Sequence, residues 1–410
     1  MTGFATRAIH GVKLKADVHG SLRAPVYDTV AFEFESAKDI HLAFAGRKPA
    51  HTYSRITNPT VEDFEQRIRL ISGGTAAIAV SSGMAAISNV ILTLAGAGTN
   101  IVTSKHLFGN TLSLFEKTLK PWGLEVRYVD MSAPAEVRRA IDENTRAVFL
   151  ESITNPQLEV ADFKAIAKVT SEESVPLIVD GTVTTPYLFR SKEFGVNIEV
   201  LSSTKYISGG ATSIGGVIVD NGNFDWRKSP RLKDWANKMG PLALLGALRR
   251  EVFRNVGSCL APHHAYLHSL GLETMSLRID KSCSNALDLA EFLQQHERVS
   301  SVNYPGLPES EFHEIASTQF ANRYGGILTF DLESRAACFE LLDNLNLIKR
   351  ATNVNDNKTL ILHPASTIFC EYPDEVLSDI GVRQTMIRLS AGIEDFDDLR
   401  NDLESGLAAL

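Results

Sequence analysis

The sequence predicts an α/β fold in which a mostly parallel sheet is flanked by helices and followed by a smaller C-terminal α+β domain. The first observation is that short β-rich runs at 100–104, 125–129, 147–152, 176–180, 199–203 and 215–220 alternate with helix-like stretches. Such alternation is typical of a parallel sheet wrapped by helices. The second is that this alternation stops after about residue 221, and strands and helices then follow in a mixed order.

Length and composition narrow the class of protein. The chain has 410 residues, 44% of them hydrophobic and 22% charged, which fits two or three ordinary globular domains. A net charge of −8 argues against nucleic acid as the main partner. We see neither a signal peptide nor the roughly 18 apolar residues of a membrane span, so we expect a cytoplasmic location and no membrane. The cysteines form no CxxC pair, and we expect reduced thiols and no metal site.

The chain divides into three predicted parts. Residues 1–60 are irregular and rich in Gly, Pro and aromatic residues, which is typical of an arm that contacts a neighbouring subunit. Residues 61–260 form the sheet domain and 261–410 the C-terminal domain. We expect a helix to begin at Thr60, where Thr60 and Asp63 fit a capping box. The aromatic, Gly- and Pro-punctuated stretch near 221–250 is either a lid or an interface.

A strand-to-helix turn offers an anion site. The apolar run 76–80 leads into Ser81, Ser82 and Gly83, and a long helix opens at about Met84. Small residues at such a turn leave backbone N–H groups free at the positive end of the helix dipole. The alternative is an ordinary tight turn.

Lys205 lies in an unusual place for a lysine. It stands among Ser, Thr and Gly between two buried strand-like runs, at 199–203 and 215–220. Burial lowers the pKa of a lysine, and a neutral amine can form a Schiff base with a carbonyl. The alternative is a surface lysine on a tight turn.

Other polar groups are expected near Lys205. Ligands of parallel sheets bind beyond the carboxyl ends of the strands. The residues that follow these strands are Glu151, Asn155, Asp180, Thr182, Ser202 and Thr204. Arg388 lies inside an apolar strand, and a buried arginine needs an anion, either a structural ion-pair partner or the carboxylate of a ligand.

Together these groups suit pyridoxal 5′-phosphate. The lysine can bind its aldehyde, the helix end its phosphate, and an acid its pyridine nitrogen, while the arginine binds the carboxylate of an amino-acid substrate. A nicotinamide dehydrogenase is the alternative by chemistry, but the sequence lacks the GxGxxG fingerprint.

The motifs YSRITNPT, SSGM, ESITNP, VDGT and SSTKY occur in this order. In this respect the chain resembles the pyridoxal-phosphate-dependent enzymes of cysteine and methionine metabolism over nearly its whole length. The resemblance implies the aspartate-aminotransferase-like, type I fold of these transferases. It also implies a homotetramer built from two dimers, with active sites shared between subunits.

The resemblance also implies residue roles. Lys205 is similar to the lysine that binds the cofactor, and Asp180 to the acid at its ring nitrogen. Tyr53 and Arg55 are similar to residues that reach the phosphate from a neighbouring subunit. The other implied cofactor contacts are Ser82, Gly83, Met84, Phe108, Asn155, Thr182, Ser202 and Thr204, and the implied substrate contacts are Asn155, Thr359 and Arg388.

Three segments indicate a branch of the family. Phe108 occupies the ring-stacking position, where tyrosine is usual. The segment 352–367 resembles the O-acetylhomoserine sulfhydrylases, although Asn355 stands where glycine is usual. The following residues, 368–372, depart from the commoner family pattern.

The resemblance therefore implies an O-acetyl-L-homoserine sulfhydrylase. Such an enzyme replaces acetate by a sulfur nucleophile, either sulfide or the thiocarboxylate of a sulfur-carrier protein, and forms homocysteine in methionine biosynthesis. A methionine or cystathionine γ-lyase, a cystathionine γ-synthase and a non-catalytic binding protein are the alternatives.

Overall fold

The large sheet has seven strands in the order β1-β7-β6-β5-β4-β2-β3. Only β7 runs against its neighbours, so the prediction of a mostly parallel sheet is confirmed. This description rests on a computed structural model, which describes residues 3–12 and 19–410. The strands are β1 (Ala76–Val80), β2 (Asn100–Thr103), β3 (Glu125–Tyr128), β4 (Thr145–Glu151), β5 (Leu177–Asp180), β6 (Ile198–Leu201) and β7 (Gly216–Asp220).

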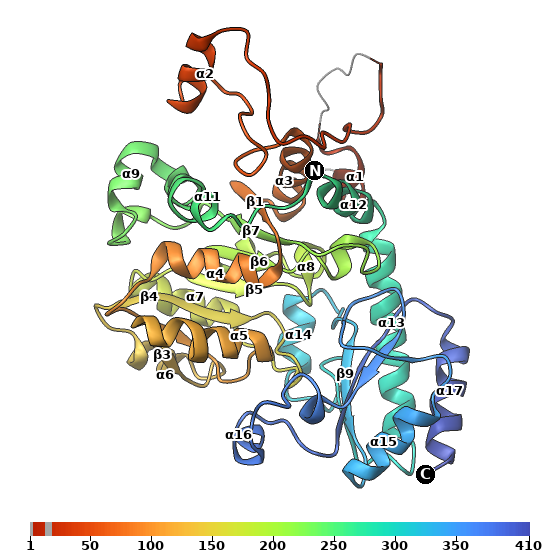
Figure 1. Cartoon of the computed structure of the whole chain (residues 1–410). Helices are drawn as coiled ribbons and strands as arrows, with labels where there is room; N and C mark the ends of the chain where they lie inside the picture. The colour runs from red at the N-terminus through yellow and green to blue at the C-terminus, as the bar shows by residue number, and fades with distance from the viewer. Residues whose placement is uncertain (1–2, 13–18) are drawn as a thin grey trace.

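Helices cover both faces of this sheet (Figure 1). Along β5, Leu177 and Val179 pack into one hydrophobic core, and Ile178 packs into the other. Buried side chains on both faces explain why these strands are continuous apolar runs rather than alternating ones. The helices that follow the strands are α4 (Gly83–Leu94), α5 (Gly109–Ser113), α6 (Pro134–Ala140), α7 (Phe163–Glu172) and α8 (Thr185–Leu188).

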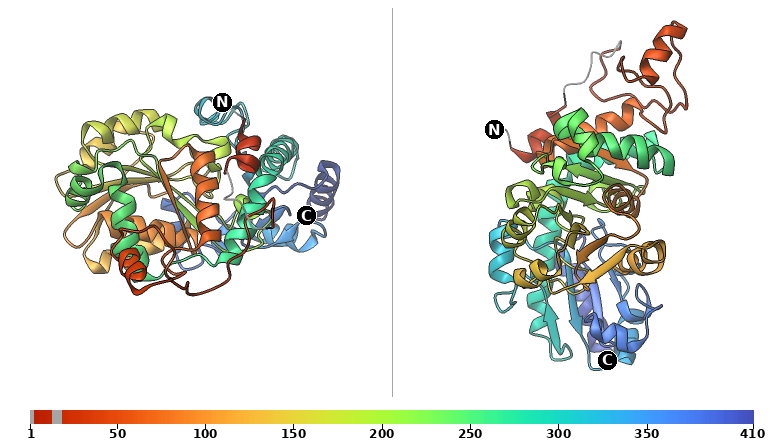
Figure 2. Two further views of the ribbon diagram at one scale, coloured as in Figure 1. Left: turned by 90° about the horizontal axis from the view of Figure 1, so that it is seen from above. Right: turned by 90° about the vertical axis from the view of Figure 1, so that its left-hand side faces the viewer.

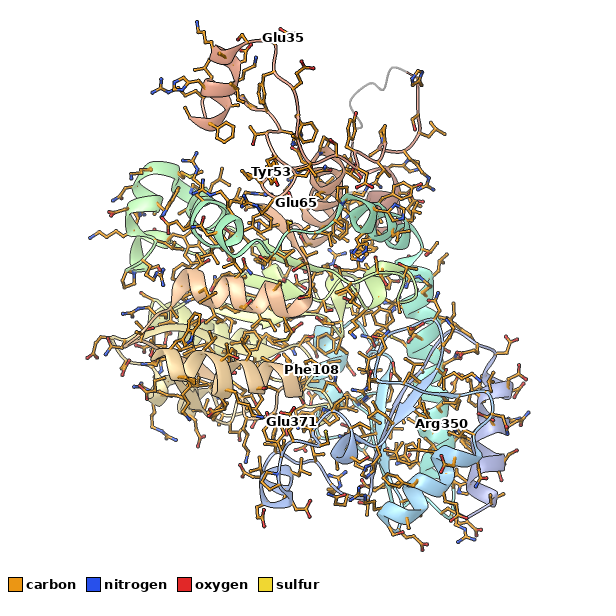
Figure 3. All side chains as sticks on the ribbon, viewed as in Figure 1. Glu35, Tyr53, Glu65, Phe108, Arg350 and Glu371 are labelled. Carbon is orange, nitrogen blue, oxygen red and sulfur yellow. The ribbon has the colours of Figure 1, made fainter. Side chains whose placement is uncertain are left out.

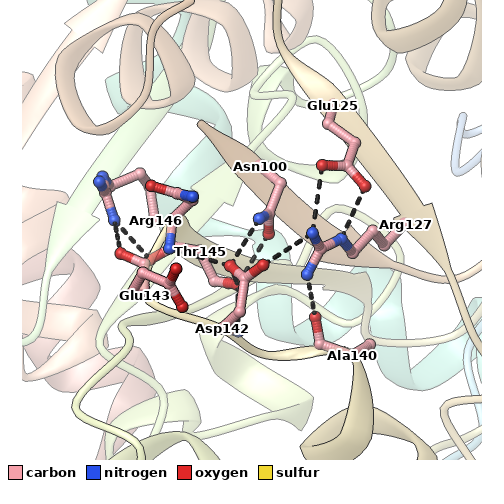
Figure 4. Close-up of polar contacts among 9 residues, drawn as sticks. Asn100, Glu125, Arg127, Ala140, Asp142, Glu143, Thr145 and Arg146 are labelled. Atoms are coloured by element: carbon pink, nitrogen blue, oxygen red, sulfur yellow. Dashed lines mark hydrogen bonds and ion pairs between the residues drawn. The ribbon is translucent and has the colours of Figure 1, made fainter. Parts of the chain in front are cut away.

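A polar network joins the amino ends of β2, β3 and β4 (Figure 4). Asp142 accepts a hydrogen bond from Asn100 at 2.8 Å and pairs with Arg127 at 2.8 Å, and Arg127 also pairs with Glu125. The Asn100 amide and the Arg127 guanidinium hold the pKa of Asp142 below its ordinary value. These charged groups therefore link the amino ends of the three strands to one another.

The C-terminal part contains a second, mixed sheet in the order β10-β11-β12-β9-β8. In Figure 1 it lies below the large sheet, with the long helix α13 beside it, which confirms the predicted α+β domain. Its strands are β8 (Ser301–Asn303), β9 (Ile327–Asp331), β10 (Lys349–Arg350), β11 (Leu360–Leu362) and β12 (Met386–Ser390). Its helices are α13 (Met275–Gln294), α14 (His313–Gln319), α15 (Arg335–Asn344), α16 (Asp374–Asp379) and α17 (Phe396–Ala408).

The N-terminal segment is more helical than predicted. It contains α1 (Phe4–His10) and α2 (Ala37–Phe44), and α2 projects from the body of the chain (Figures 1 and 2). The next helix, α3 (Pro59–Ser72), is capped by Asn58, whose side chain accepts a hydrogen bond from Thr60 N at 2.9 Å. The predicted capping box is therefore wrong, because the Thr60 hydroxyl instead accepts a hydrogen bond from Tyr27 N.

The stretch near 221–250 forms part of the large unit. It contains α9 (Lys233–Met239) and α10 (Ala243–Ala247), and α11 (Arg254–Val256) follows. Ala243 and Leu244 are fully buried in the same core as α4, so the segment is not a detached lid. Farther on, α12 (Pro262–Glu273) packs on α3. None of the helices in the described ranges is both long and apolar enough to cross a membrane.

Candidate active site

A cavity of about 240 Å³ lies at the carboxyl ends of the parallel strands. The turn before α4, the ends of β4, β5 and β6, and Arg388 on β12 contribute to its wall. The structure thus brings together most of the residues singled out in the sequence. Those that line the cavity are Ser82, Gly83, Met84, Phe108, Glu151, Asn155, Asp180, Thr182, Ser202, Thr204, Lys205 and Arg388.

The amino end of α4 forms one wall. The Ser82 hydroxyl caps the helix by accepting a hydrogen bond from Ala85 N at 3.0 Å. The N–H groups of Gly83 and Met84 donate to no acceptor in the described part of the chain. A Cβ on Gly83 would lie 2.7 Å from the Cβ of Ser202, so only glycine permits this close approach. Free N–H groups at a helix end beside a small hydroxyl residue suit a phosphate group.

Lys205 follows β6 in a tight turn. Thr204 secures this turn, since its hydroxyl donates to Gly215 O and accepts from Gly215 N, both at 3.1 Å. The Lys205 amine donates to Asn353 Oδ1 at 2.5 Å. Burial and the positive charge of Arg388, opposed by Asp356, together lower the pKa of Lys205 to about 8. The alternative of an exposed lysine is therefore wrong, and a neutral amine is accessible near neutral pH.

Asp180 is the last residue of β5 and lines the cavity. Its Oδ1 accepts two hydrogen bonds from Thr182, from the backbone N at 2.9 Å and from the hydroxyl at 2.5 Å. Burial raises the pKa of Asp180. Its Oδ2 accepts no hydrogen bond from residues 3–12 or 19–410. A cationic ring nitrogen in the cavity would give this carboxylate the partner that keeps it ionised.

Glu151 holds two neighbouring segments in place. Its Oε1 accepts from Phe108 N at 2.6 Å, and its Oε2 accepts from Asn155 N at 3.2 Å. Burial and the nearby Asp180 raise the pKa of Glu151 to about 8. Figure 3 labels Phe108 where the large sheet meets the C-terminal part. The contacts of Glu151 agree with a structural rather than a catalytic role.

Arg388 is a buried cation without a carboxylate partner in the described ranges. Its side chain is among the most buried in the chain, at 2% exposure. It donates to Asn155 Oδ1 at 3.1 Å and to Asn353 O at 3.3 Å, and its Nε has no partner there. Burial lowers its pKa to about 10. The alternative of a structural ion pair is therefore wrong, and the carboxylate of a ligand would satisfy this guanidinium.

Thr359 does not line the cavity. It is fully buried, and its hydroxyl donates to Glu394 Oε2 at 2.8 Å while accepting from Gly392 N at 2.9 Å. These bonds fix the start of β11 to the loop after β12. The predicted contact of Thr359 with the substrate carboxylate therefore differs from the structure, in which Thr352 and Val354 line the cavity beside Arg388 instead.

Tyr53 and Arg55 also lie outside the cavity of their own chain. Arg55 donates to Arg254 O at 2.6 Å, and its guanidinium lies 5.4 Å from the centre of the Tyr53 ring. Figure 3 shows Tyr53 in the upper part of the chain, well apart from Phe108. Their approach to the site of a second subunit stays a prediction.

Sequence reasoning missed several other residues of the site. Asn353, which contacts Lys205, lies in a loop without periodicity. The departure at Asn355 has a structural reason, since its φ is 57° and asparagine tolerates this left-handed region better than most residues. The remaining lining residues are Ile87, Thr111, Ile153, Val183, Ile214, Thr352 and Val354.

The lining residues fit pyridoxal 5′-phosphate. The α4 terminus would hold its phosphate, Asp180 its ring nitrogen, Phe108 its ring face and Lys205 its aldehyde. The unpartnered Nε of Arg388 supplies a separate carboxylate site for an amino acid. Within the described ranges, no group of three or more His, Cys, Asp and Glu side chains could hold a metal ion.

Comparison with known proteins agrees with this geometry. The chain is 39% identical to the O-acetyl-L-homoserine sulfhydrylase of Corynebacterium glutamicum, covering 100% of this chain and 97% of the relative. It is 51% identical to an O-acetylhomoserine sulfhydrylase structure from Wolinella succinogenes, with a TM-score of 0.78 over 86% of this chain and 99% of that one.

A third protein bears on the cofactor. A chain from Campylobacter jejuni, assigned as an O-acetylhomoserine (thiol)-lyase, superposes with a TM-score of 0.95 at 32% identity, covering 99% of this chain and 100% of that one. It carries a pyridoxyl-lysine phosphate at its position 205. The sequence model of the Cys/Met metabolism PLP-dependent enzymes matches residues 5–408. The chain therefore belongs to the family of Cys/Met metabolism PLP-dependent enzymes.

Proposed function

We propose that this protein catalyses replacement of the acetate group of O-acetyl-L-homoserine by a sulfur nucleophile, giving homocysteine. One observation carries the proposal: Lys205, Asp180 and Arg388, whose guanidinium has no carboxylate partner among the described residues, converge on a cavity that Phe108 also lines. The sulfhydrylases among the relatives support the same reaction.

Each of the site residues has a distinct role in the proposed reaction. When bound, pyridoxal phosphate supplies the electron sink that acidifies the protons of the substrate's α and β carbons. Arg388 binds and orients the substrate carboxylate with its planar guanidinium. The Lys205 amine, with its pKa lowered to about 8, accepts the α proton and relays a second one from the β carbon. Asp180 keeps the ring nitrogen charged.

Phe108 suits a substrate with a good leaving group. Acetate leaves as a stable anion and needs little protonation, so this position can dispense with a hydroxyl. A γ-lyase or a cystathionine γ-synthase would share every cofactor contact and differ in the fate of the γ carbon. We therefore propose that Phe108 favours replacement over elimination.

The assembly and location belong to the same proposal. A homotetramer of two dimers, with Tyr53 and Arg55 reaching the site of a neighbouring subunit, would explain why both lie outside their own cavity. Free sulfide is the proposed donor, with the thiocarboxylate of a sulfur-carrier protein as the alternative. The cytoplasm is the proposed location.

A product assay tests the reaction. Purified enzyme with cofactor receives O-acetylhomoserine with or without sulfide, and homocysteine and oxobutyrate are quantified. We expect homocysteine that depends on sulfide and little oxobutyrate. Equal oxobutyrate in both samples would instead identify a γ-lyase. In a companion sample, Phe108→Tyr should raise the ratio of oxobutyrate to homocysteine, and an unchanged ratio would reject the assigned role of Phe108.

A further inference from the structure

The catalytic lysine is tethered by an asparagine. Lys205 Nζ donates to Asn353 Oδ1 at 2.5 Å, and Asn353 Nδ2 donates to Asp356 Oδ2 at 3.1 Å. An ionised carboxylate only accepts hydrogen bonds, so Asp356 fixes the amide with its NH₂ toward itself. The Asn353 carbonyl oxygen must then face Lys205.

Asp356 is itself well fixed. It is 9% exposed, and its second oxygen accepts from Lys358 N at 3.2 Å. Lys205 thus faces charges from several elements: Arg388 on β12, Asp356 on the 352–359 loop, and Asp180 and Glu151 at the ends of β5 and β4. Arg388 and Asp356 act on the amine with opposite sign.

We propose that Asn353, oriented by Asp356, is a positioning residue. It holds the Lys205 amine in a fixed position within the cavity whenever the amine is not bound to the cofactor. The inference rests on the proposed function, in which one amine must serve two adjacent substrate carbons. A lysine side chain has a flexible four-carbon stem, and an amine free to move on it loses the alignment that proton transfer needs. The acceptor at 2.5 Å restricts this freedom.

Two readouts test the proposal in Asp356→Asn and Asn353→Ala. The first is the pH dependence of the rate at which the cofactor-free, full-length chain takes up pyridoxal phosphate, followed by visible absorbance. It reports the apparent pKa of the Lys205 amine without any turnover. The second is kcat and KM for homocysteine formation. Lys358→Ala is the control, because it removes an exposed charge from the same loop.

Asp356→Asn should lower the apparent pKa of Lys205 by about 1 unit, since a negative charge near the amine is lost. Arg388→Met should raise it, because a positive charge is lost. Asn353→Ala should lower kcat about tenfold with little change in KM, since alignment rather than binding is impaired. Lys358→Ala should leave both readouts near the wild type.

Wild-type pKa and kcat in both Asp356→Asn and Asn353→Ala would overturn the proposal. A fall in kcat without any shift of the apparent pKa in Asp356→Asn would also overturn it, because general loss of structure explains that pattern. If the wild type forms no homocysteine, the proposed function fails, whereas the pKa shifts still decide whether Asn353 and Asp356 act on Lys205.

Discussion

Arg388 is a buried guanidinium whose only polar contacts in the described residues are neutral oxygens. Removing a charge from water without an opposite charge costs stability, and a carboxylate ligand offsets that cost only when it is bound. The uncompensated charge of Arg388 therefore lowers the stability of the free chain, and a bound carboxylate would offset this cost. Arg278 is a matched control, because it is also buried and donates to neutral oxygens, Gly271 O at 2.7 Å and the Thr274 hydroxyl at 3.1 Å, but lies outside the cavity.

Arg388→Met should raise KM for the amino-acid substrate at least about tenfold while the thermal midpoint of the substrate-free protein stays level or rises by about 2–4 °C. Arg278→Met should likewise leave the midpoint level or raise it, because its described partners are also neutral oxygens, but it should leave KM near the wild type. Thermal unfolding and steady-state kinetics check both variants. A clear loss of stability in Arg388→Met would show that its neutral partners already satisfy the charge.

The buried carboxyl group of Glu199 should make the stability of the folded chain depend on pH. It is 1% exposed on β6, Ser191 donates to its Oε2, and its Oε1 has no partner among the described residues. Burial raises its pKa to about 8. The raised value means that this group favours the folded state below its unfolded pKa and that this contribution is lost as pH rises toward 8.

Glu199→Gln should therefore be more stable than the wild type at pH 8, and the difference should shrink on going to pH 5. The reason is that glutamine needs no proton to stay neutral when buried. Thermal midpoints of both proteins at several pH values measure this difference. A difference independent of pH would contradict the protonation argument.

Residues at strand ends were predictable from the sequence, and loop residues were not. Lys205, Asp180 and Asn155 follow apolar runs whose parallel packing brings their ends to one edge. Asn353 lies in a non-periodic loop and reaches Lys205 only through tertiary packing. The position of Thr359 outside the cavity lining was not predictable, because nothing in its local sequence shows that Glu394 takes its hydroxyl.

At the scale of elements, the α4 terminus joins folding to cofactor binding. The Ser82 hydroxyl pairs the N–H of Ala85, and Gly83 and Met84, which precede Ala85, line the cavity. Ser334 caps α15 in the same way, accepting from Ala337 N at 3.1 Å, but it does so away from the cavity.

Ser82→Ala and Ser334→Ala should each cost about 0.5–2 kcal/mol in the free energy of unfolding, because each leaves a helix start uncapped. Only Ser82→Ala should also weaken retention of pyridoxal phosphate, since only its helix end faces the site. Denaturant unfolding and cofactor dissociation during dialysis measure the two effects. Equal cofactor loss in both variants would show that the α4 terminus does not bind the phosphate.

Long apolar strands and amphipathic helices were predictable, while short elements were not. The buried runs of β4, β5 and β7 match their predicted positions closely. The strands β8 and β10 have three and two residues, too few for a periodic signal. The cap of α3 was misplaced because contacts with residues 25–27 hold the Thr60 hydroxyl, and the Asn58 side chain caps the helix instead.

At the scale of the whole molecule, the N-terminal segment exposes apolar side chains that a single chain leaves uncovered. Val30 is 61% exposed and Phe44 66% exposed, and the α2 region projects from the body (Figure 2). Such a surface is typical of a contact with another copy of the chain. The sequence predicted the arm, but a single chain does not contain the partner that would define its contacts.

Mixing inactive variants tests whether Tyr53 and Arg55 act between subunits. Arg55→Ala and Lys205→Ala should each be inactive, and refolding them together in equal amounts should restore about one quarter of wild-type activity, because half of the dimers are mixed and each has one intact site. Separately refolded samples are the control. Mixed samples that remain as inactive as the separate ones would place Arg55 outside the neighbouring site.

The incorporation of isotopically labelled sulfide tests the central claim most directly. Enzyme loaded with cofactor receives O-acetylhomoserine and labelled sulfide, and mass spectrometry follows the label alongside Lys205→Ala as the inactive control. The proposed function predicts one labelled sulfur in each homocysteine, acetate in equal amount, and no product from Lys205→Ala. Oxobutyrate as the main product, with the label left in sulfide, would contradict the proposed reaction.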